Sequence, residues 1–382
     1  MSRVFYVDAL NGSDANAGTA PEAAWQSIDM VNSASLQPGD TVLFARGRTW
    51  EGTLKVDESG TADAPITFGA YGEGAAPIID GGDHAIVGEN KHHIVVQGLD
   101  LRNTDDVAIF VSDSSHWTFD QLNFDHTGVE RTKGGGGIQS WYSDEMTVSN
   151  STFTNVTGDS LWFWDTDGLR ILNNHFNTNQ GGTADNVHIY DATNFEIRGN
   201  YMDMSGDTNS GKGNLLLQNS HDGVVAGNIF NGGAFGLSVH ASNTTVEGNR
   251  FIGHNKAKWS AGILSGNHND VENLTIQGNL FEDSRAGIYL FGKNDREGIT
   301  IQGNVFENPH DAALKVGRST PLGGSFAHNI MIAQNGAALT KVSGSKGDDW
   351  IETENVTATD MIPAAAEIYT RFGLDPAQYL TT

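Results

Sequence analysis

Short runs of alternating apolar and polar residues recur along most of the chain and are separated by turns rich in glycine and asparagine. One run lies just before each turn, as in LTIQ and FEIR, and a second lies further upstream, as in GIYLF and NVHIY. A period of two predicts β-strands, and no helical period is sustained between the runs. The pattern therefore predicts an all-β protein of many short strands.

One motif repeats within this pattern: an asparagine, usually after glycine, is followed two residues later by a large apolar residue. Its copies begin at intervals of 21 to 30 residues, at Asn174, Asn200, Asn228, Asn249, Asn279, Asn304 and Asn329. Intervals of this size are typical of solenoids, and two or three strands per repeat predict a parallel β-helix of about 10–12 coils. We expect the asparagines to point inward at one corner and to bond the backbone of the neighbouring coil, forming a ladder.

The two ends of the chain depart from the repeat. Residues 1–60 predict an N-terminal cap and first coil, with a short amphipathic helix around Trp25–Ala34. Residues 352–382 predict a helical tail that could cap the other end, which leaves residues 1–351 as a single β-helix domain.

Composition narrows the classes of partner. The 382 residues include 22 basic and 47 acidic ones, a net charge of −25, which disfavours nucleic acid and anionic membranes as partners. There is no cysteine, so disulfides and thiolate chemistry are excluded. No apolar run is long enough for a membrane span, and the first residues do not form a signal peptide.

The stretch FYVDALNGSDANAGT, followed by SLQPGDTVLFARGRTWEG and SGTADAPITFGAYGEGAAPIIDGG, resembles the opening of many polysaccharide lyases. These are right-handed parallel β-helix enzymes, including the alginate lyase and chondroitinase B group and larger pectate lyases. The resemblance is close over roughly the first 80 residues and looser to about residue 340. It implies a right-handed β-helix and a carbohydrate polymer as the usual substrate, although this superfold also hosts hydrolases, epimerases and tailspikes.

Aligning the upstream strands by their inward apolar pairs assigns the alternate residues to the outer surface. The pairs run from Val107/Ile109 through Leu161/Phe163 to Leu314/Val316. Because coils stack about 4.8 Å apart, the outward aromatic and histidine side chains would form one patch. Its predicted members are Trp141, Trp162, Trp164, His188, Tyr190 and His240, extended by Tyr289 and Phe291. Cross-strand stacking or a covering loop would explain such a patch, but we favour a sugar-binding surface.

Basic residues gather in the loops that enter these strands, which suggests an anionic ligand such as a uronate polymer. Lys133 and Lys212 lie in such loops, and Lys315 lies on the outer face of a later strand. We therefore predict that Lys133, Lys315, Tyr289 and the three tryptophans bind substrate.

Three interpretations remain open for the aspartates that follow these strands. Asp165 and Asp191 could be the paired carboxylates of a glycoside hydrolase. Asp165, Asp167 and Asp191 could instead bind Ca²⁺, the one cofactor we expect, with no organic cofactor. They could also simply form turns.

β-Elimination from a uronate requires a base for the C5 proton, an acid for the leaving oxygen and neutralisation of the carboxylate. His188, Tyr190, Asp165, Asp191, Lys212 and His240 are the candidate catalytic residues. We expect elimination first, hydrolysis second, and a non-enzymatic carbohydrate-binding solenoid third.

The segment GSKGDDWIE at residues 344–352 resembles one glycine- and aspartate-rich nonapeptide of RTX proteins, which bind Ca²⁺ and leave the cell by a type I route. With the acidic composition, it favours a secreted bacterial protein. We expect the protein to be a monomer.

Overall fold

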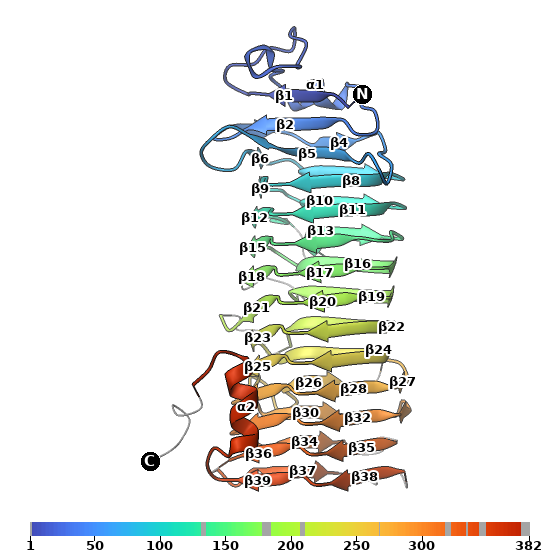
Figure 1. Cartoon of the computed structure of the whole chain (residues 1–382), viewed down its shortest axis with the longest axis vertical. Helices are drawn as coiled ribbons and strands as arrows, with labels where there is room; N and C mark the ends of the chain where they lie inside the picture. Colours follow the sequence, from blue (N-terminus) through green and yellow to red (C-terminus); the bar gives the residue numbers. More distant parts are fainter. Residues whose placement is uncertain are drawn as a thin grey trace. The chain divides into compact units, whose positions relative to one another are not determined.

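The computed structural model describes residues 2–130, 135–177, 185–206, 211–266, 268–317, 322–333, 335–343 and 349–375. Its contacts divide the chain into two compact units, residues 1–187 and 188–382, and each is described by itself. Both units consist of parallel β-helix coils with up to three short strands each, which we call the first, second and third strands (Figure 1). The predicted fold class is confirmed.

In unit 1, strands of each kind pair in parallel from one coil to the next. The first strands are β4 (Leu54–Val56), β7 (Ile86–Glu89), β10 (Ile109–Ser112), β13 (Gly135–Trp141) and β16 (Asp159–Asp167). The second strands are β1 (Val4–Val7), β2 (Thr41–Ala45), β5 (Ile66–Tyr71), β8 (His92–Gln97), β11 (Ser115–Asp120), β14 (Thr147–Ser149) and β17 (Arg170–Leu172). The third strands are β3 (Thr49–Glu51), β6 (Ile78–Asp80), β9 (Asp100–Arg102), β12 (Asn123–Asp125), β15 (Thr152–Thr154) and β18 (His175–Asn177).

Unit 2 repeats this arrangement after β19 (Val187–Thr193), β20 (Glu196–Arg198) and β21 (Tyr201–Met204). First and second strands are continuous in β22 (Gly213–Ala226) and β24 (Phe235–Glu247), with third strands β23 (Ile229–Gly232) and β25 (Arg250–Ile252). The later first strands are β26 (Ala261–Ser265), β30 (Ala286–Leu290), β34 (Ala312–Val316) and β37 (Ala338–Val342). The later second strands are β28 (Leu274–Gln277), β32 (Ile299–Gln302), β35 (Gly324–Ala327) and β38 (Trp350–Thr353). The later third strands are β29 (Leu280–Glu282), β33 (Val305–Glu307), β36 (Ile330–Ile332) and β39 (Val356–Ala358), and β27 (Val271–Glu272) pairs separately with β31 (Arg296–Glu297).

The asparagine ladder predicted from the repeat is present in unit 2. Asn249 Oδ1 accepts from the backbone N–H of Asn228 at 2.9 Å, and its Nδ2 donates to the Val225 carbonyl at 2.9 Å. The same pattern continues from Asn279 to Asn329 and ends at Asn355, a rung outside the predicted set. The apolar residue that follows each asparagine stacks in the core, as in Phe251 on Phe281 at 4.8 Å. The motif thus satisfies buried corner groups and fills the core at once.

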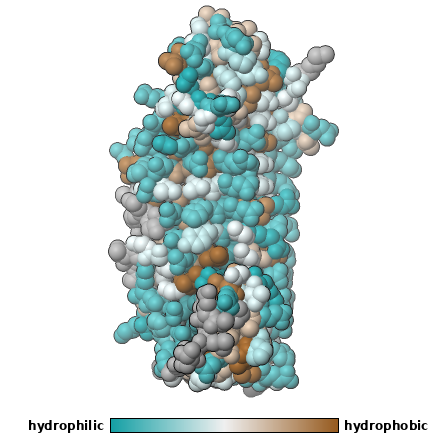
Figure 2. Space-filling model, turned by 60° about the vertical axis from the view of Figure 1, so that its left-hand side comes forward, coloured by the Kyte–Doolittle hydropathy of each residue, from teal (hydrophilic) through white to brown (hydrophobic). Residues whose placement is uncertain are grey.

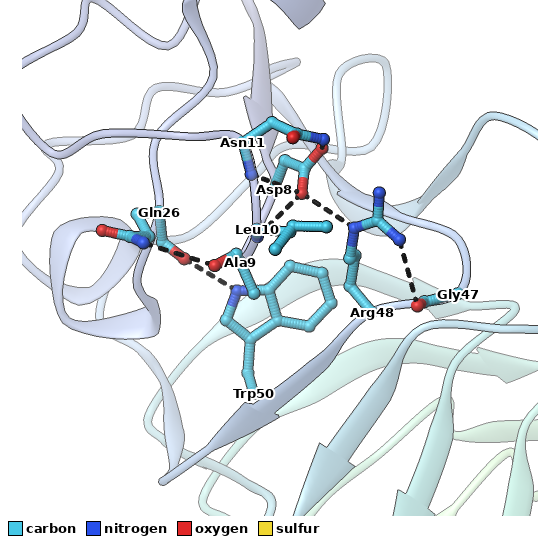
Figure 3. A network of polar contacts seen from close by, with 8 residues as sticks. All are labelled: Asp8, Ala9, Leu10, Asn11, Gln26, Gly47, Arg48 and Trp50. Atoms are coloured by element: carbon cyan, nitrogen blue, oxygen red, sulfur yellow. Dashed lines mark hydrogen bonds and ion pairs between the residues drawn. The ribbon is translucent and has the colours of Figure 1, made fainter.

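The N-terminal cap explains the first part of the resemblance, FYVDALNGSD. Asp8 Oδ1 accepts from the backbone N–H groups of Leu10 and Asn11, and from Arg48 Nε at 3.0 Å (Figure 3). Burial raises the pKa of Asp8, but these hydrogen bonds outweigh it and hold that pKa below its ordinary value. Asp8 therefore fastens the cap to the strand ends of the first coils.

Both predicted end helices form, and both are shorter than their predicted segments. The 3₁₀ turn η1 (Pro21–Ala23) precedes α1 (Ile28–Asn32), whose N-cap Ser27 accepts from the Met30 N–H at 3.1 Å. At the other end β38 and β39 continue past the predicted boundary at residue 351, and the helix α2 (Pro363–Arg371) follows them. No helix in the described ranges is long and apolar enough to cross a membrane. Hydrophilic residues predominate on the face drawn in Figure 2, in keeping with the net charge.

Candidate functional site

The first strands of both units follow the predicted alternation. Leu161 and Phe163 of unit 1 are fully buried, as are Leu215 and Leu217 of unit 2. In unit 1 the register sets Gln139 beside Trp162 and Trp141 beside Trp164. Side chains at alternate positions therefore form columns on the outer face, as the alignment of inward pairs predicted.

Three tryptophans of unit 1, Trp141, Trp162 and Trp164, form what we call the tryptophan cluster. The Trp141 ring lies 6.3 Å from both other rings at interplanar angles of 82° and 77°, so it packs edge to face on each of them. Trp164 is 36% exposed, and Tyr142 beside it is 51% exposed. Half-buried rings held at fixed angles present rigid apolar faces to solvent.

Asp165 follows Trp164 at a corner where the backbone is left-handed, with φ of 56°. Asn90, Asp113 and Tyr142 hold the same conformation at this corner of earlier coils. Because asparagine and aspartate tolerate left-handed geometry better than other non-glycine residues, the turn alone accounts for an Asx residue here. Asp165 is also exposed beside the cluster, so it remains available to a bound ligand. Asp167, two residues on, donates its backbone N–H to Asp144 Oδ1 at 2.9 Å.

In unit 2, β19 carries His188, Tyr190 and Asp191. His188 Nε2 lies 2.9 Å from Gln218 Oε1, and Gln218 Nε2 lies 2.9 Å from His268 Nδ1. Because Gln218 Oε1 can only accept, this arrangement makes Nε2 a protonated nitrogen of His188, so a neutral ring would have its basic nitrogen at Nδ1. Tyr190 is 37% exposed, and Asp191 accepts a hydrogen bond from Asn219 Nδ2.

His240 was expected on the outer surface but is only 1% exposed. Its strand position does face outward, yet His268 packs on its ring at 4.4 Å and Asn269 donates to its carbonyl at 3.1 Å. Burial, then the charges of His268 and Arg296, lower the pKa of His240 to about 3. A neutral, covered ring does not reach a substrate. His240 instead packs on His268, which is linked through Gln218 to His188, and we call these four side chains the histidine network.

Of the predicted cationic residues, Lys315 and Lys212 lie in the described part of unit 2. Lys315 pairs with Asp311 at 3.0 Å and lies 4.7 Å from the centre of the Tyr289 ring. Tyr289 in turn packs on the buried cluster that includes Phe235 and Leu264. Lys212 is half-buried before β22, and Lys133 lies outside the described residues. Residues 344–348 of the predicted nonapeptide lie outside them too.

Within the described ranges, no three His, Cys, Asp or Glu side chains lie close enough together to hold a metal ion. Calcium binding by Asp165, Asp167 and Asp191 stays a prediction. Asp165 and Asp167 belong to unit 1 and Asp191 to unit 2, so we treat them separately.

The sequence analysis missed two members of the histidine network. Gln218 lies at an outward position of β22 but was given no role, and His268 lies in a bend outside the aligned strands. It also gave no role to Asp159 in unit 1, which is 5% exposed. The backbone N–H of Asp185 donates to Asp159 Oδ1 at 2.7 Å. The alternation of apolar and polar residues predicts which face of a strand a side chain lies on, but it does not predict that a carboxylate at a strand end is buried.

Comparison with known proteins gives a family. Residues 123–321 and 181–357 match the family model described as periplasmic copper-binding protein (NosD), and together these stretches include most of the chain. The chain belongs to this family. Lacto-N-biosidase of Bifidobacterium longum subsp. longum is 33% identical over 207 residues, 45% of this chain. That match takes in only 12% of the lacto-N-biosidase.

Solved structures share the fold. The GH136 lacto-N-biosidase from Eubacterium ramulus superposes with a TM-score of 0.65 at 14% identity, over 93% of this chain and 68% of that one. A mannuronic acid specific polysaccharide family 6 lyase from human gut microbiota gives 0.64 at 16% identity, over 98% and 90%. The Streptococcus pneumoniae surface protein and adhesin PfbA gives 0.51 at 14% identity, over 84% and 89%. These likenesses establish the fold alone.

Proposed function

We propose that the chain is a glycan-cleaving enzyme that binds sugar on the tryptophan cluster of unit 1. The observation that carries the proposal is the cluster itself, because Trp164 is partly open to solvent and packs edge to face on Trp141, with the exposed Tyr142 ring tilted beside it. Pyranose rings have apolar faces that lie on aromatic rings while their hydroxyls stay free to hydrogen-bond. Relatives of this chain include a lacto-N-biosidase by sequence and a polysaccharide lyase by fold, which supports a glycan as substrate.

For the reaction, we propose hydrolysis of a glycosidic bond. The relative at 33% identity is a glycosidase by name, and a net charge of −25 disfavours a polyanionic substrate. Among the described cations, Lys315 is occupied by Asp311, and Lys256 donates to the Met204 carbonyl at 3.2 Å. Asp165, exposed beside the cluster, is the carboxylate we propose for acid or nucleophile chemistry in unit 1.

Elimination is the second candidate, and the hydrogen bond between His188 and Gln218 favours it. With Nε2 protonated, Nδ1 of His188 could take the C5 proton of a uronate. The C–H electron pair would form the C4–C5 double bond, the C4–O bond would break, and the leaving oxygen would take a proton from Tyr190. All of these groups belong to unit 2, so this candidate is independent of Asp165.

The two candidates predict different products from a panel of neutral and uronate-containing glycans. Hydrolysis gives new reducing ends without ultraviolet absorbance, whereas elimination gives reducing ends together with the absorbance of an unsaturated uronate. Binding with neither product would contradict both reactions and support a carbohydrate-binding solenoid. We also propose that the protein works outside the cytoplasm, in line with the periplasmic location in the family's description.

A further inference from the structure

Helix α2 lies beside the third strands of unit 2 (Figure 1). Its C-terminal end forms one wall of a groove of about 710 Å³. The helix is firmly placed, because Ile368 and Tyr369 pack on Leu280 and Val305, and the Tyr369 hydroxyl donates to Glu307. Arg371 and Phe372, at its C-terminal end, line the groove. The opposite side is the corner that precedes the asparagine ladder.

Glycine holds this corner in four successive coils, at Gly227, Gly248, Gly278 and Gly303, each with a left-handed backbone. The backbone alone does not require glycine, because Asn150 and Asn173 adopt φ of 49° and 56° at the same corner of unit 1. A Cβ built on Gly227, Gly248 or Gly303 would meet no atom within 4 Å, so a side chain there would enter the groove. On Gly278 a Cβ would come within 3.1 Å of Arg371 Nη1. The glycines therefore keep the groove open.

A row of polar side chains runs along the same groove, with one member per coil. Gln277 Nε2 donates to Glu247 Oε2 at 3.0 Å, and Gln302 Nε2 donates to Gln277 Oε1 at 3.1 Å. These bonds fix the amides in register, about 4.8 Å apart along the stack. The row thus offers donors and acceptors at regular intervals to an extended ligand.

We propose that this groove is a second carbohydrate site, which binds an extended oligosaccharide along the row of Glu247, Gln277 and Gln302. A peptide strand would need a free sheet edge, but the strands here already pair with their neighbours above and below. Nucleic acid is disfavoured by the net charge of −25. The groove offers a sugar chain repeated amides for its hydroxyls, the aromatic ring of Phe372 for an apolar ring face, and the guanidinium of Arg371 as a further donor.

The test is binding of the 382-residue chain to immobilised neutral and uronate-containing oligosaccharides, comparing wild type with the double variant Gly248→Asn, Gly303→Asn. Asparagine keeps the left-handed corner, as Asn150 and Asn173 do, but fills the groove. We expect binding to weaken about tenfold or more, with the unfolding temperature unchanged. Gly98→Asn is the matched control, because Gly98 holds the same corner in unit 1 with φ of 67° and does not line the groove.

Unchanged binding by the double variant, or an equal loss in Gly98→Asn, would overturn the proposal. Should the double variant fold poorly, Gln302→Ala removes one exposed amide of the row and must weaken binding as well. The assignment does not depend on the proposed function, and we expect cleavage of a short substrate to stay unchanged in the groove variants. A protein that binds through the groove but cleaves nothing would sink the proposed function and leave this site standing.

Discussion

At the corners of the coils, the backbone conformation explains the residue type without any catalytic role. Asp165 and Asp191 both have φ of 56°, and Asn219 holds the same conformation with φ of 49°. Left-handed corners favour aspartate, asparagine and glycine, although Tyr142 also holds one, so aspartates that follow strands are weak evidence for a catalytic pair. Trp164 is different, because no backbone requirement places an exposed tryptophan next to such a corner.

The histidine network makes one prediction at this scale. In Gln218→Glu the new carboxylate faces His188 Nε2 and favours the charged ring, so the pKa of His188 rises. If elimination is the reaction, the acidic limb of the pH–rate profile moves to higher pH, because the base must be neutral. Gln218→Leu would instead remove the acceptor of the His188 hydrogen bond, and it would lower the rate without moving the acidic limb of the profile. A profile identical in both variants and wild type would remove His188 from the mechanism and leave hydrolysis.

The period of two in the sequence predicts which face of a strand each side chain lies on, but it does not predict which other residues cover that face. Leu161 and Phe163 were assigned to the core, and Trp162 and Trp164 to the outside, from a period of two alone. His240 has the correct parity and is nevertheless buried, because His268 covers it. That cover comes from a turn of a later coil, and nothing within the strand of His240 encodes it. For the same reason Gln218 and His268 could not be recognised as one network.

At the scale of the element, the asparagine ladder stabilises each coil through its neighbours. Asn279 Oδ1 accepts from the backbone N–H of Asn249 at 2.8 Å, and its Nδ2 donates to the Val246 carbonyl at 3.0 Å. All three residues lie in unit 2 within its described part. The sequence predicted this element well, because buried corner groups must be satisfied in each coil and a short amide that both accepts and donates can do so from inside.

Replacing a rung tests the ladder. In Asn279→Ala a buried N–H and a buried carbonyl lose their partners, and each loss costs about 1–3 kcal/mol of unfolding free energy. Chemical denaturation of the variant measures the change. Asn123→Ala, an exposed asparagine on β12, is the control and should stay close to wild type. Equal stability of the two variants would show that the ladder carries no net energy.

Over the whole molecule, buried neutral histidines couple stability to pH. Burial lowers the pKa of His254 to about 3, although the backbone at Phe230 and Gly232 favours its charged form. His240 is likewise lowered to about 3. From the ordinary value of 6.5 down to about 3, the unfolded chain therefore binds protons that the folded chain does not. Their contribution is fully present above pH 6.5 and is lost progressively as the pH falls toward 3.

Denaturant unfolding followed between neutral and mildly acidic pH measures this dependence. The unfolding free energy should fall across that range, and less steeply in His254→Gln or His240→Gln, since each variant removes one such group. A curve that is flat in wild type would contradict the burial of both rings. Asp8 acts at lower pH, because its contribution is lost only as the pH falls through its own depressed pKa.

The most direct measurement of the central claim is glycan cleavage by Trp164→Ala and Trp259→Ala beside wild type. The two tryptophans are 36% and 39% exposed, but Trp259 belongs to unit 2, where its ring packs on Phe235. The account predicts that kcat/KM falls about tenfold or more in Trp164→Ala, while Trp259→Ala and the stability of both variants stay near wild type. Full activity in Trp164→Ala, or no cleavage of any glycan by wild type, would contradict it.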